Sequence, residues 1–381
     1  MKFKAKTKSL IDILSISNTI VETSAVIPII RNIVLSLTGN KLRFTSSDMM
    51  NTLVSEIEVT GESDGTSCID GKLLLNILKN LSEESVMIDS KEVEVETLVG
   101  NVKQKSIQLS IVLTTTSGKY DIPGLNPKDF PKVPIVENST KLEISGEAFR
   151  DAIAKVSFAV VAEMGDILNN IYLDIQEGSL TVAGVNNAVF SEVEHKIVSE
   201  KAKTLLVNKK SLLLSKTLFS KGDVEINYNA NFVVFSNENI QLFARLADGI
   251  FPNYKAVFPK SSQNILLINN TQLGQAIKRL LVMANGALNL FALDFQESQL
   301  VISTSDKDFG KSAIEQLPIQ YSGEPLRIGI NGKYLLEVLN TMSSENVNLS
   351  VISPNKPIVI WPDDESSQRA LIGPMSLVGM D

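Results

Sequence analysis

The sequence predicts an α+β protein built from three tandem copies of one unit, each with two helices packed on antiparallel sheets. Three features support this fold class: a helical segment, a strand–turn–strand segment and a proline-rich stop each recur along the 381-residue chain. Self-similarity at a regular period indicates a duplicated supersecondary unit. Division of the chain also fits its length, since single hydrophobic cores stop growing beyond roughly 250–300 residues.

The first recurring segment carries the pattern Lys-x-Leu-Leu within a short amphipathic stretch. It reads IDGKLLLNILKNL at 69–81, VNKKSLLLSKTLF at 207–219 and INGKYLLEVLNTM at 330–342. An apolar run typical of a strand precedes each copy, and another follows it. We therefore predict a helix between two strands in every unit, with Lys72, Lys210 and Lys333 at equivalent positions.

A second set of segments has the pattern strand, polar turn, strand. These segments lie at 31–50, 169–188 and 288–307, and stretches with helical spacing precede them at 8–20, 146–161 and 270–285. In the last of these, apolar residues follow the spacing of an amphipathic helix, at Leu273, Ile277, Leu280, Leu281 and Ala284. The alternative, chance similarity between αβ patterns, does not explain why the Lys-x-Leu-Leu segment always follows a matching hairpin. Each unit is thus predicted as helix, strands, helix, strands.

Proline-rich stretches separate the copies. DIPGLNPKDFPKVP (121–134) is interpreted as the linker between the first and second copies, and DGIFPNYKAVFP (248–259) as the linker between the second and third. Proline, glycine and aspartate in such density end secondary structure. The predicted domains are 1–124, 141–250 and 251–381, with 125–140 as a linker.

Composition indicates an intracellular protein. The single cysteine, Cys68, rules out an internal disulfide and fits a reducing cytosol. Asp12 interrupts the apolar stretch near the N-terminus, and no small-residue cleavage site follows, which argues against a signal peptide. The apolar stretch at 26–37 contains Arg31 and is too short to span a bilayer. We expect a soluble, cytoplasmic, nucleoid-associated protein without a membrane partner.

Charge is segregated along the chain. The formal net charge of −7 argues against a nucleic-acid partner when taken alone. However, the six predicted helical segments (8–23, 70–82, 146–162, 208–221, 270–285 and 331–342) hold 12 basic and 6 acidic residues. If all six helices face one way, they form a surface that attracts the phosphates of duplex DNA without reading sequence. The alternative is that these charges are merely solvated.

Nine basic residues on these helices are the candidates for contact with DNA. They are Lys72, Lys79, Arg150, Lys155, Lys209, Lys210, Lys216, Lys278 and Arg279. Few aromatic residues accompany them, so base stacking on single strands is not indicated. Double-stranded DNA held by its backbone is the predicted ligand.

Catalytic motifs are not found. The one histidine, His195, lies in an alternating strand-like stretch and is interpreted as a surface residue rather than a general base. No phosphate-binding loop, HExxH motif or metal-spaced Cys/His cluster occurs in the sequence. The acidic pair Asp363-Asp364 lies in a turn-like stretch, and SDKD (305–308) lacks the ligands of a calcium loop. We predict no enzyme, cofactor or metal; a hydrolase that depends on His195 is the remaining alternative.

At full length, the residues resemble the bacterial DNA polymerase III beta subunit, the beta sliding clamp family. The resemblance runs from MKFKAK through LNPKDFP and FPNYKAVFP to GPMSL, and FPNY-x-x-V-x-P is its most specific part. It implies clamp-type domains that assemble as a head-to-tail homodimer, a ring with helices lining the hole and a continuous sheet outside. It also implies that the ring encircles duplex DNA and tethers a replicative polymerase, a clamp loader and repair polymerases.

The resemblance further implies a pocket for apolar peptides of these partners. Its wall would comprise Leu168, Val189, Pro252, Val257, Leu371, Ile372, Pro374, Met375 and Leu377. Ordinary core packing is the alternative for these residues, above all for Val189. The chain departs from the family pattern at 184–188, at Gly373, at Ser376 and in its last four residues, so its peptide preference need not follow the family's.

For the ring contact, the resemblance points to the strand around Tyr120 and Ile122 facing the third-copy helix around Val282 and Met283. Intramolecular core is the alternative for the latter pair. A different function remains open as well: an αβ repeat scaffold that binds only proteins, with its helix lysines solvated.

Overall fold

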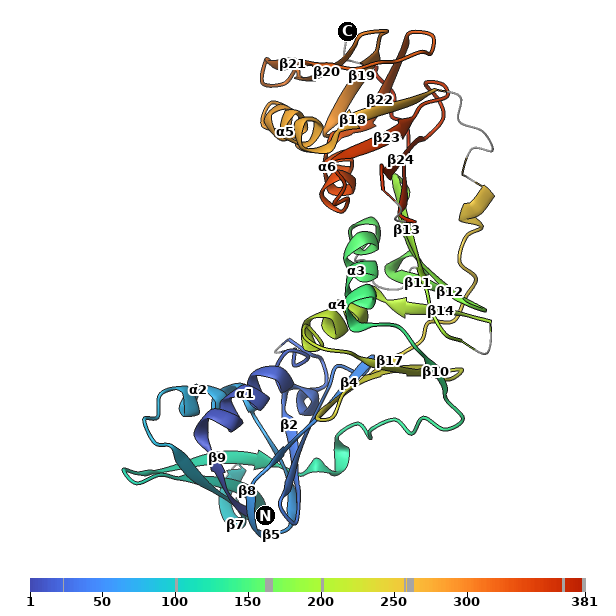
Figure 1. Ribbon diagram of the computed structural model, residues 1–381. Coiled ribbons are helices and arrows are strands. Elements are labelled where there is room, and N and C mark those ends of the chain that lie inside the picture. The colour runs from blue at the N-terminus through green and yellow to red at the C-terminus, as the bar shows by residue number, and fades with distance from the viewer. Residues whose placement is uncertain are drawn as a thin grey trace. The chain divides into compact units, whose positions relative to one another are not determined.

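The computed structural model describes every residue except 23, 100–101, 162–166, 200–201, 257, 259–263, 365–366 and 379–381, and only the backbone of 93–99, 102–108 and 254. The chain divides into two compact units (Figure 1). The first comprises Met1–Leu142 with Leu214–Leu246, and the second comprises Glu143–Leu213 with Ala247–Asp381. The middle repeat copy therefore contributes strands to both units.

The described residues of the first unit form an antiparallel sheet of thirteen strands, in the order β10-β15-β16-β17-β4-β3-β2-β6-β9-β8-β7-β1-β5. The strands are β1 (Lys2–Lys6), β2 (Ile33–Thr38), β3 (Lys41–Ser47), β4 (Asn51–Glu58), β5 (Thr60–Ser63), β6 (Gly65–Ile69), β7 (Ser85–Val99), β8 (Val102–Thr114), β9 (Lys119–Leu125), β10 (Thr140–Leu142), β15 (Glu225–Tyr228), β16 (Phe232–Ser236) and β17 (Ile240–Arg245). Helix α1 (Thr7–Ser17) packs against α2 (Gly71–Lys79) and against β3 and β4. Short 3₁₀ turns lie at η1 (Pro28–Arg31) and η2 (Pro127–Asp129).

The second unit contains two antiparallel sheets within the described residues. Their orders are β14-β11-β12-β13-β25-β24-β23-β18 and β21-β20-β19-β22. The strands are β11 (Asn170–Gln176), β12 (Ser179–Val185), β13 (Val189–Lys196), β14 (Lys203–Asn208), β18 (Ile265–Asn269), β19 (Leu290–Phe295), β20 (Gln299–Asp306), β21 (Lys311–Pro318), β22 (Leu326–Asn331), β23 (Asn346–Ser350), β24 (Ile358–Pro362) and β25 (Arg369–Ile372). Helix α3 (Gly146–Val156) packs on β12 and β13, and α5 (Asn270–Leu281) packs on α6 (Gly332–Asn340). The 3₁₀ turns are η3 (Ser157–Ala159), η4 (Ile167–Asn169) and η5 (Tyr254–Ala256).

One capping interaction begins the helix of the Lys-x-Leu-Leu segment in all three copies. Asp70, Asn208 and Asn331 each accept a hydrogen bond from the backbone N–H of the lysine two residues on, at 3.0, 2.9 and 2.9 Å. The helices that follow are α2, α4 (Lys209–Leu218) and α6. Such caps satisfy N–H groups that the first helical turn leaves without a partner. The predicted repeat of a helix between two strands is confirmed.

Strands β13 and β25 join the second and third copies into one sheet. The pairing runs from Val189 opposite Ile372 to Glu192 opposite Arg369. Because side chains alternate along a strand, this ladder divides its residues between two faces. Val189 and Ile372 belong to the apolar core that α5 and α6 share, whereas Phe190 belongs to a separate cluster on the other face.

The described part of 247–258 covers that other face, chiefly through Phe251 and Phe258. The ring of Phe251 stacks on that of Tyr172, with 4.6 Å between centroids and 6° between planes. Phe258 meets Phe190 edge-on at 5.4 Å. The proline-rich stretch between the second and third copies is therefore a packed strap whose aromatic rings bury apolar surface of the sheet.

Several predicted boundaries were wrong, although the predicted order of helices and strands is confirmed. Strand β9 extends to Leu125, so the linker placed at 121–134 begins inside a strand. The helices are also shorter than predicted, because α1 ends at Ser17 and α5 ends at Leu281. Ala284, beyond the end of α5, is nevertheless buried. No helix among the described residues has both the length and the apolar character needed to cross a membrane.

Removing one aromatic side chain from the strap should destabilise the second unit. Phe251→Ala removes a side chain that is only 8% exposed and should cost about 3 kcal/mol of unfolding free energy. Urea unfolding can be followed through Trp361, the chain's single tryptophan, which packs against the same cluster. Phe309→Ala, at a side chain that is 75% exposed, is the matched control. Equal decreases in stability of the two variants would contradict the packing role of Phe251.

Candidate functional site

The structure places the nine predicted DNA-contacting residues on four helices. Lys72 and Lys79 lie on α2, Arg150 and Lys155 on α3, Lys209, Lys210 and Lys216 on α4, and Lys278 and Arg279 on α5. Lys79, Lys210, Lys278 and Arg279 are exposed, and the other five are half-buried. Helices α2, α4 and α5 carry no acidic residue.

Other groups of the protein bind Lys155, Lys209 and Arg279. Lys155 forms an ion pair with Asp151 at 2.8 Å, and its side chain is only 14% exposed. Lys209 Nζ donates a hydrogen bond to the Val160 carbonyl oxygen at 2.8 Å, and burial lowers the pKa of this lysine. Each of these contacts uses part of the donor capacity of the ammonium group and holds it in place.

Arg279 makes a two-point contact with one carboxylate. Its Nε and Nη2 donate to the two carboxylate oxygens of Glu315, at 2.7 and 2.6 Å. A two-point contact of this kind fixes the guanidinium plane as well as its charge. Lys278, its neighbour on α5, is exposed and has no ion pair with a residue that the structure describes.

His195 lies on β13, as predicted, but its side chain is 20% exposed rather than on the open surface. Its Nε2 lies 3.8 Å from Asp151 Oδ2, the carboxylate that already pairs with Lys155. Burial lowers the pKa of His195, and Asp151 only partly offsets this. Cys68 is fully buried and its thiol pKa is raised to about 12. Within the described residues there is also no group of three side chains able to hold a metal ion.

A cavity of about 200 Å³ lies where the strap meets the end of the β13–β25 pair. Its lining is Val185, Asn186, Asn187, Ala188, Val189, Phe190, Pro252, Asn253, Pro357, Leu371 and Gly373. It is mainly apolar and combines residues from the second copy, the strap and the C-terminal strand. Val189, Pro252 and Leu371 were predicted at this site from the sequence.

The turn 186–188 fixes one edge of this apolar cavity. Asn186 Oδ1 accepts hydrogen bonds from the backbone N–H groups of Ala188 and Val189, at 2.8 and 3.0 Å. The N–H of Gly373 in turn donates to the Ala188 carbonyl oxygen at 2.8 Å. A Cβ at Gly373 would lie 3.3 Å from that oxygen, a close contact, so the glycine allows the two backbones to approach each other.

The other predicted pocket residues do not line the apolar cavity. Ile372 is completely buried in the core, because it points to the opposite face of β25 from Leu371. The backbone N–H of Met375 donates to the Gly329 carbonyl oxygen at 2.7 Å, which holds the C-terminal segment beside β22. Leu168, Pro374 and Leu377 are half-buried outside the lining, and Val257 lies outside the described residues.

Sequence reasoning also overlooked part of the lining. Phe190 and Asn253 adjoin predicted residues, and the alternation of β13 or the FPNY motif could have indicated them. Pro357 comes from the loop before β24. This loop is far in sequence from Phe190 and from Asn253, and no local pattern pointed to it.

The predicted ring-contact residues differ in exposure. Tyr120 and Val282 are 38% and 74% exposed, whereas Ile122 is 2% exposed. Ile122 was therefore a wrong choice, because its side chain is already buried within the first unit. Met283 is half-buried.

Two sheet edges have unused hydrogen-bonding groups. Strand β9 pairs with β8 along most of its length but with β6 only at Gly124 and Leu125. Strand β21 is one of the two outer strands of the four-stranded sheet, and Ile314 on it is 64% exposed. Edges of this kind are able to pair with another strand.

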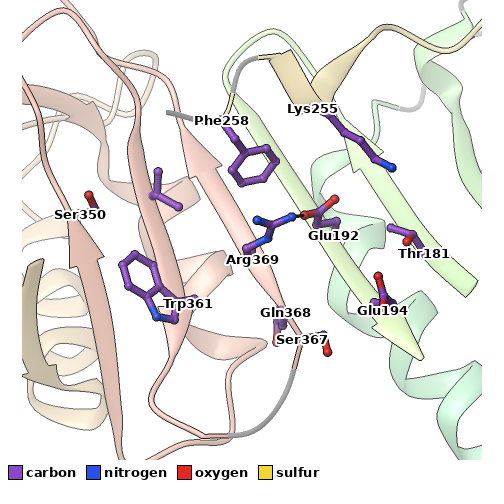
Figure 2. Close-up of a pocket in the computed structure, with 11 residues that line it drawn as sticks. Thr181, Glu192, Glu194, Lys255, Phe258, Ser350, Trp361, Ser367, Gln368 and Arg369 are labelled. Carbon is purple, nitrogen blue, oxygen red and sulfur yellow. Dashed lines mark hydrogen bonds and ion pairs between the residues drawn. The ribbon is translucent and has the colours of Figure 1, made fainter. Parts of the chain in front are cut away.

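On the strap-covered face, an ion pair between exposed Arg369 and buried Glu192 joins the second and third copies. Arg369 donates to Glu192 and its guanidinium also lies over the Phe258 ring, 4.5 Å from the centroid (Figure 2). The Glu192 side chain is 5% exposed. Burial raises the pKa of the Glu192 carboxyl, and Arg369 offsets part of this rise.

Family models of the DNA polymerase III beta subunit match almost the whole chain: the N-terminal domain at residues 1–134, the central domain at 143–253 and the C-terminal domain at 255–376. A solved DNA polymerase sliding clamp from Bacillus subtilis is similar with a TM-score of 0.90 and 21% identity, over 99% of each chain. A sliding clamp from Pseudomonas aeruginosa bound to griselimycin has a TM-score of 0.87 and 22% identity, over 99% of this chain and 100% of the other. The beta sliding clamp of Staphylococcus epidermidis is 23% identical over 390 residues, covering 98% of this chain and 99% of its own.

The fold is therefore that of the DNA polymerase sliding clamps. Since the three family models cover far more than half of its residues, the chain belongs to the DNA polymerase III beta subunit family. The family resemblance predicted from the sequence is confirmed.

The buried carboxyl of Glu192 should leave a pH signature. Because its pKa is raised in the folded protein, its contribution to stability is greatest below about pH 4.5, the ordinary value, and falls as pH rises through the raised pKa. Glu192→Gln cannot ionise, so its stability relative to wild type should improve as pH rises from about 4 to about 7. Thermal unfolding across that range measures the difference, with Glu177→Gln on the exposed β11–β12 turn as control. A difference that stays constant with pH would contradict this assignment.

Proposed function

We propose that the protein is a DNA sliding clamp, a processivity factor that encircles duplex DNA and tethers replication proteins without catalysing a reaction. The observation that carries this proposal is that α2, α4 and α5 bear basic but no acidic residues, in a family member whose net charge is −7. Basic helices attract the DNA backbone regardless of sequence, while an acidic exterior repels DNA elsewhere.

In this proposal, two copies of the chain close head to tail into a ring. The incompletely paired edge of β9 and the outer edge of β21 supply the two complementary contacts of each junction. Exposed apolar residues at both places, Tyr120 on β9 and Ile314 on β21, favour burial against another chain. Pairing these edges would also satisfy backbone N–H and C=O groups that, left unpaired, promote aggregation. We assign the clamp domains to 1–124, 141–250 and 251–381, with the linker at 125–140.

The apolar cavity supports the second half of the proposal, that partners dock through short peptides. It is concave, mainly apolar and bordered by amide groups of Asn186, Asn187 and Asn253, a combination suited to anchoring an apolar side chain beside a peptide backbone. The partners would be the replicative polymerase, the clamp loader and repair polymerases. The Pseudomonas aeruginosa clamp bound to griselimycin is a relative that holds a ligand.

The two neighbours on α5 should differ in their contribution to DNA binding. Lys278→Ala should lower the salt dependence of binding to linear duplex, by about 0.9 in the log–log slope for each phosphate that the variant no longer neutralises. Arg279→Ala should have a smaller effect, because Glu315 already neutralises that guanidinium. Fluorescence anisotropy at several salt concentrations measures both slopes.

Glu315→Gln provides the reverse experiment, since it releases Arg279 and should strengthen DNA binding. Lys196→Ala, at an exposed position on β13, is the control outside the helices. Identical slopes for the wild type and Lys278→Ala would instead favour a scaffold that binds only proteins.

Filling the apolar cavity should block ligand binding. Gly373→Leu adds a side chain to the cavity lining at the cost of a small shift of the Ala188 carbonyl, and should weaken griselimycin binding by about tenfold or more, which is about 1.4 kcal/mol. Isothermal titration calorimetry measures the affinity. In Gly286→Leu, the matched control, a Cβ meets no atom within 4 Å. Equal affinities of both variants for griselimycin would remove this cavity from the proposal.

A further inference from the structure

The junction between the first and second copies repeats the local structure that surrounds the apolar cavity. Strand β4 pairs with β17 there (Figure 1), as β13 pairs with β25 between the second and third copies. A tight turn comes before each junction strand, at 48–50 before β4 and at 186–188 before β13. The first junction lies wholly within the first unit, and the repeat allows its residues to be compared with those of the cavity.

The two turns are held by the same hydrogen bonds. Asp48 Oδ1 accepts from the backbone N–H groups of Met50 and Asn51, at 3.1 and 2.7 Å. Asn186 makes the equivalent two bonds in the other turn. Each of these two capping residues also donates its own backbone N–H to the carbonyl oxygen three residues on. The turns are therefore equivalent in structure as well as in their place in the repeat.

The strand that faces each turn makes an equivalent contact as well. Arg245, the last residue of β17, donates its N–H to the Met50 carbonyl oxygen at 3.0 Å. At the other junction, Gly373 donates to Ala188 in the same way. Arg245 and its partner thus stand where two small residues line the apolar cavity. Long side chains build a surface at the first junction, where small ones leave a cavity at the second.

Two methionines are exposed at the first of these turns. Met49 and Met50 are 55% and 47% exposed. Met49 also has a φ of 75°, in the left-handed region that favours glycine or asparagine. Neither burial nor the conformation of the turn therefore explains why methionine stands there. Its flexible, polarisable side chain is suited to contact with partner surfaces of varied shape.

The linker between the first and second copies passes beside this turn. Phe130 is buried against β2 and β6, and Val133, three residues on, packs against the cluster that contains Phe243 of β17. Lys132 lies between these two anchors and is exposed. Since Phe243 and Arg245 are two residues apart on one face of β17, the linker places a second cation near that arginine.

The charge beside the methionines is positive and available. Arg245 and Lys132 are both exposed, and neither has an ion pair with a residue that the structure describes. The carboxylate of Asp48 is bound by N–H groups of its own turn. A ligand carboxylate could therefore bind these cations without displacing one that belongs to the protein. Apolar side chains next to such cations complement an apolar segment that carries a negative charge.

We propose that Met49, Met50 and Arg245 form a second docking surface, which binds an apolar segment of a partner protein that contains an acidic residue. The methionines contact the apolar side chains, the guanidinium binds the carboxylate at two points, and Lys132 adds to the attraction. The inference goes beyond docking at the apolar cavity and rests on the proposed function only in that the segment belongs to a partner of the clamp. The two junctions of one chain thereby select partners of different charge.

Methionine methyl groups provide a direct test. In a chain labelled with [methyl-¹³C]methionine, the resonances of Met49 and Met50 report on this surface and are assigned through Met49→Asn and Met50→Leu. Titration with the peptide acetyl-Leu-Leu-Asp-amide should shift both resonances in a saturable way. The neutral peptide acetyl-Leu-Leu-Asn-amide should bind about tenfold more weakly, because it lacks the charge that strengthens the bond to Arg245.

Variants separate the two parts of the surface. Arg245→Gln should lower the affinity for the acidic peptide to that for the neutral one, whereas Lys196→Gln, at an exposed cation on β13, should leave it unchanged. Met49→Asn suits the left-handed backbone, so thermal unfolding should show an intact fold while both peptides bind more weakly.

The inference is overturned by the absence of a saturable shift, by equal affinities for the two peptides, or by undiminished binding in Arg245→Gln. Equal shifts with inorganic phosphate or short duplex DNA would also overturn it, because the cations would then serve phosphate. The proposed function is tested separately by griselimycin and DNA binding. If those succeed while the peptide gives no shift, only this inference fails; if the shifts appear while both of those fail, the docking surface stands and the clamp function falls.

Discussion

The pairing of β13 with β25 is the contact on which the second unit depends. It joins four residues near 190 to four near 370, and so makes one sheet from two repeat copies. One face of that sheet completes the core under α5 and α6, which leaves the other face for the strap and the apolar cavity. Without this ladder, the strap cluster would lose Leu371 and Val359, and the apolar cavity would not have a second wall.

In the proposed clamp, the charge distribution favours loose rather than tight contact with DNA. The helices are basic, but Lys155, Lys209 and Arg279 are partly or fully committed to groups of the protein itself. A partner carboxylate offsets positive charge that would otherwise attract a phosphate, and so lowers the affinity for DNA. A closed ring does not need high affinity, because it is retained by topology, and weak contacts allow it to move along the duplex.

The repeat and the helix positions could be predicted from sequence, because the Lys-x-Leu-Leu segment and its Asp or Asn cap are local signals. The exact strand ends could not, since β9 continues through a Pro-Gly pair once β8 provides hydrogen bonds. In the apolar cavity, Pro252 and Leu371 were predictable from the family resemblance. Ile372 was wrongly placed in the lining because the alternation of side chains along a strand was not applied to the C-terminal segment. The Arg279–Glu315 pair joins residues that no motif connects, and only the tertiary fold brings them together.

Topological retention is the central claim, and release from DNA measures it most directly. The protein would be loaded onto nicked circular duplex, moved to high salt, and followed before and after a restriction enzyme linearises the DNA. A ring should stay on the circle at salt concentrations that screen its lysines, and should slide off the ends once the circle is cut. Equal retention on circular and linear DNA, or release from both on raising the salt, would contradict a closed clamp.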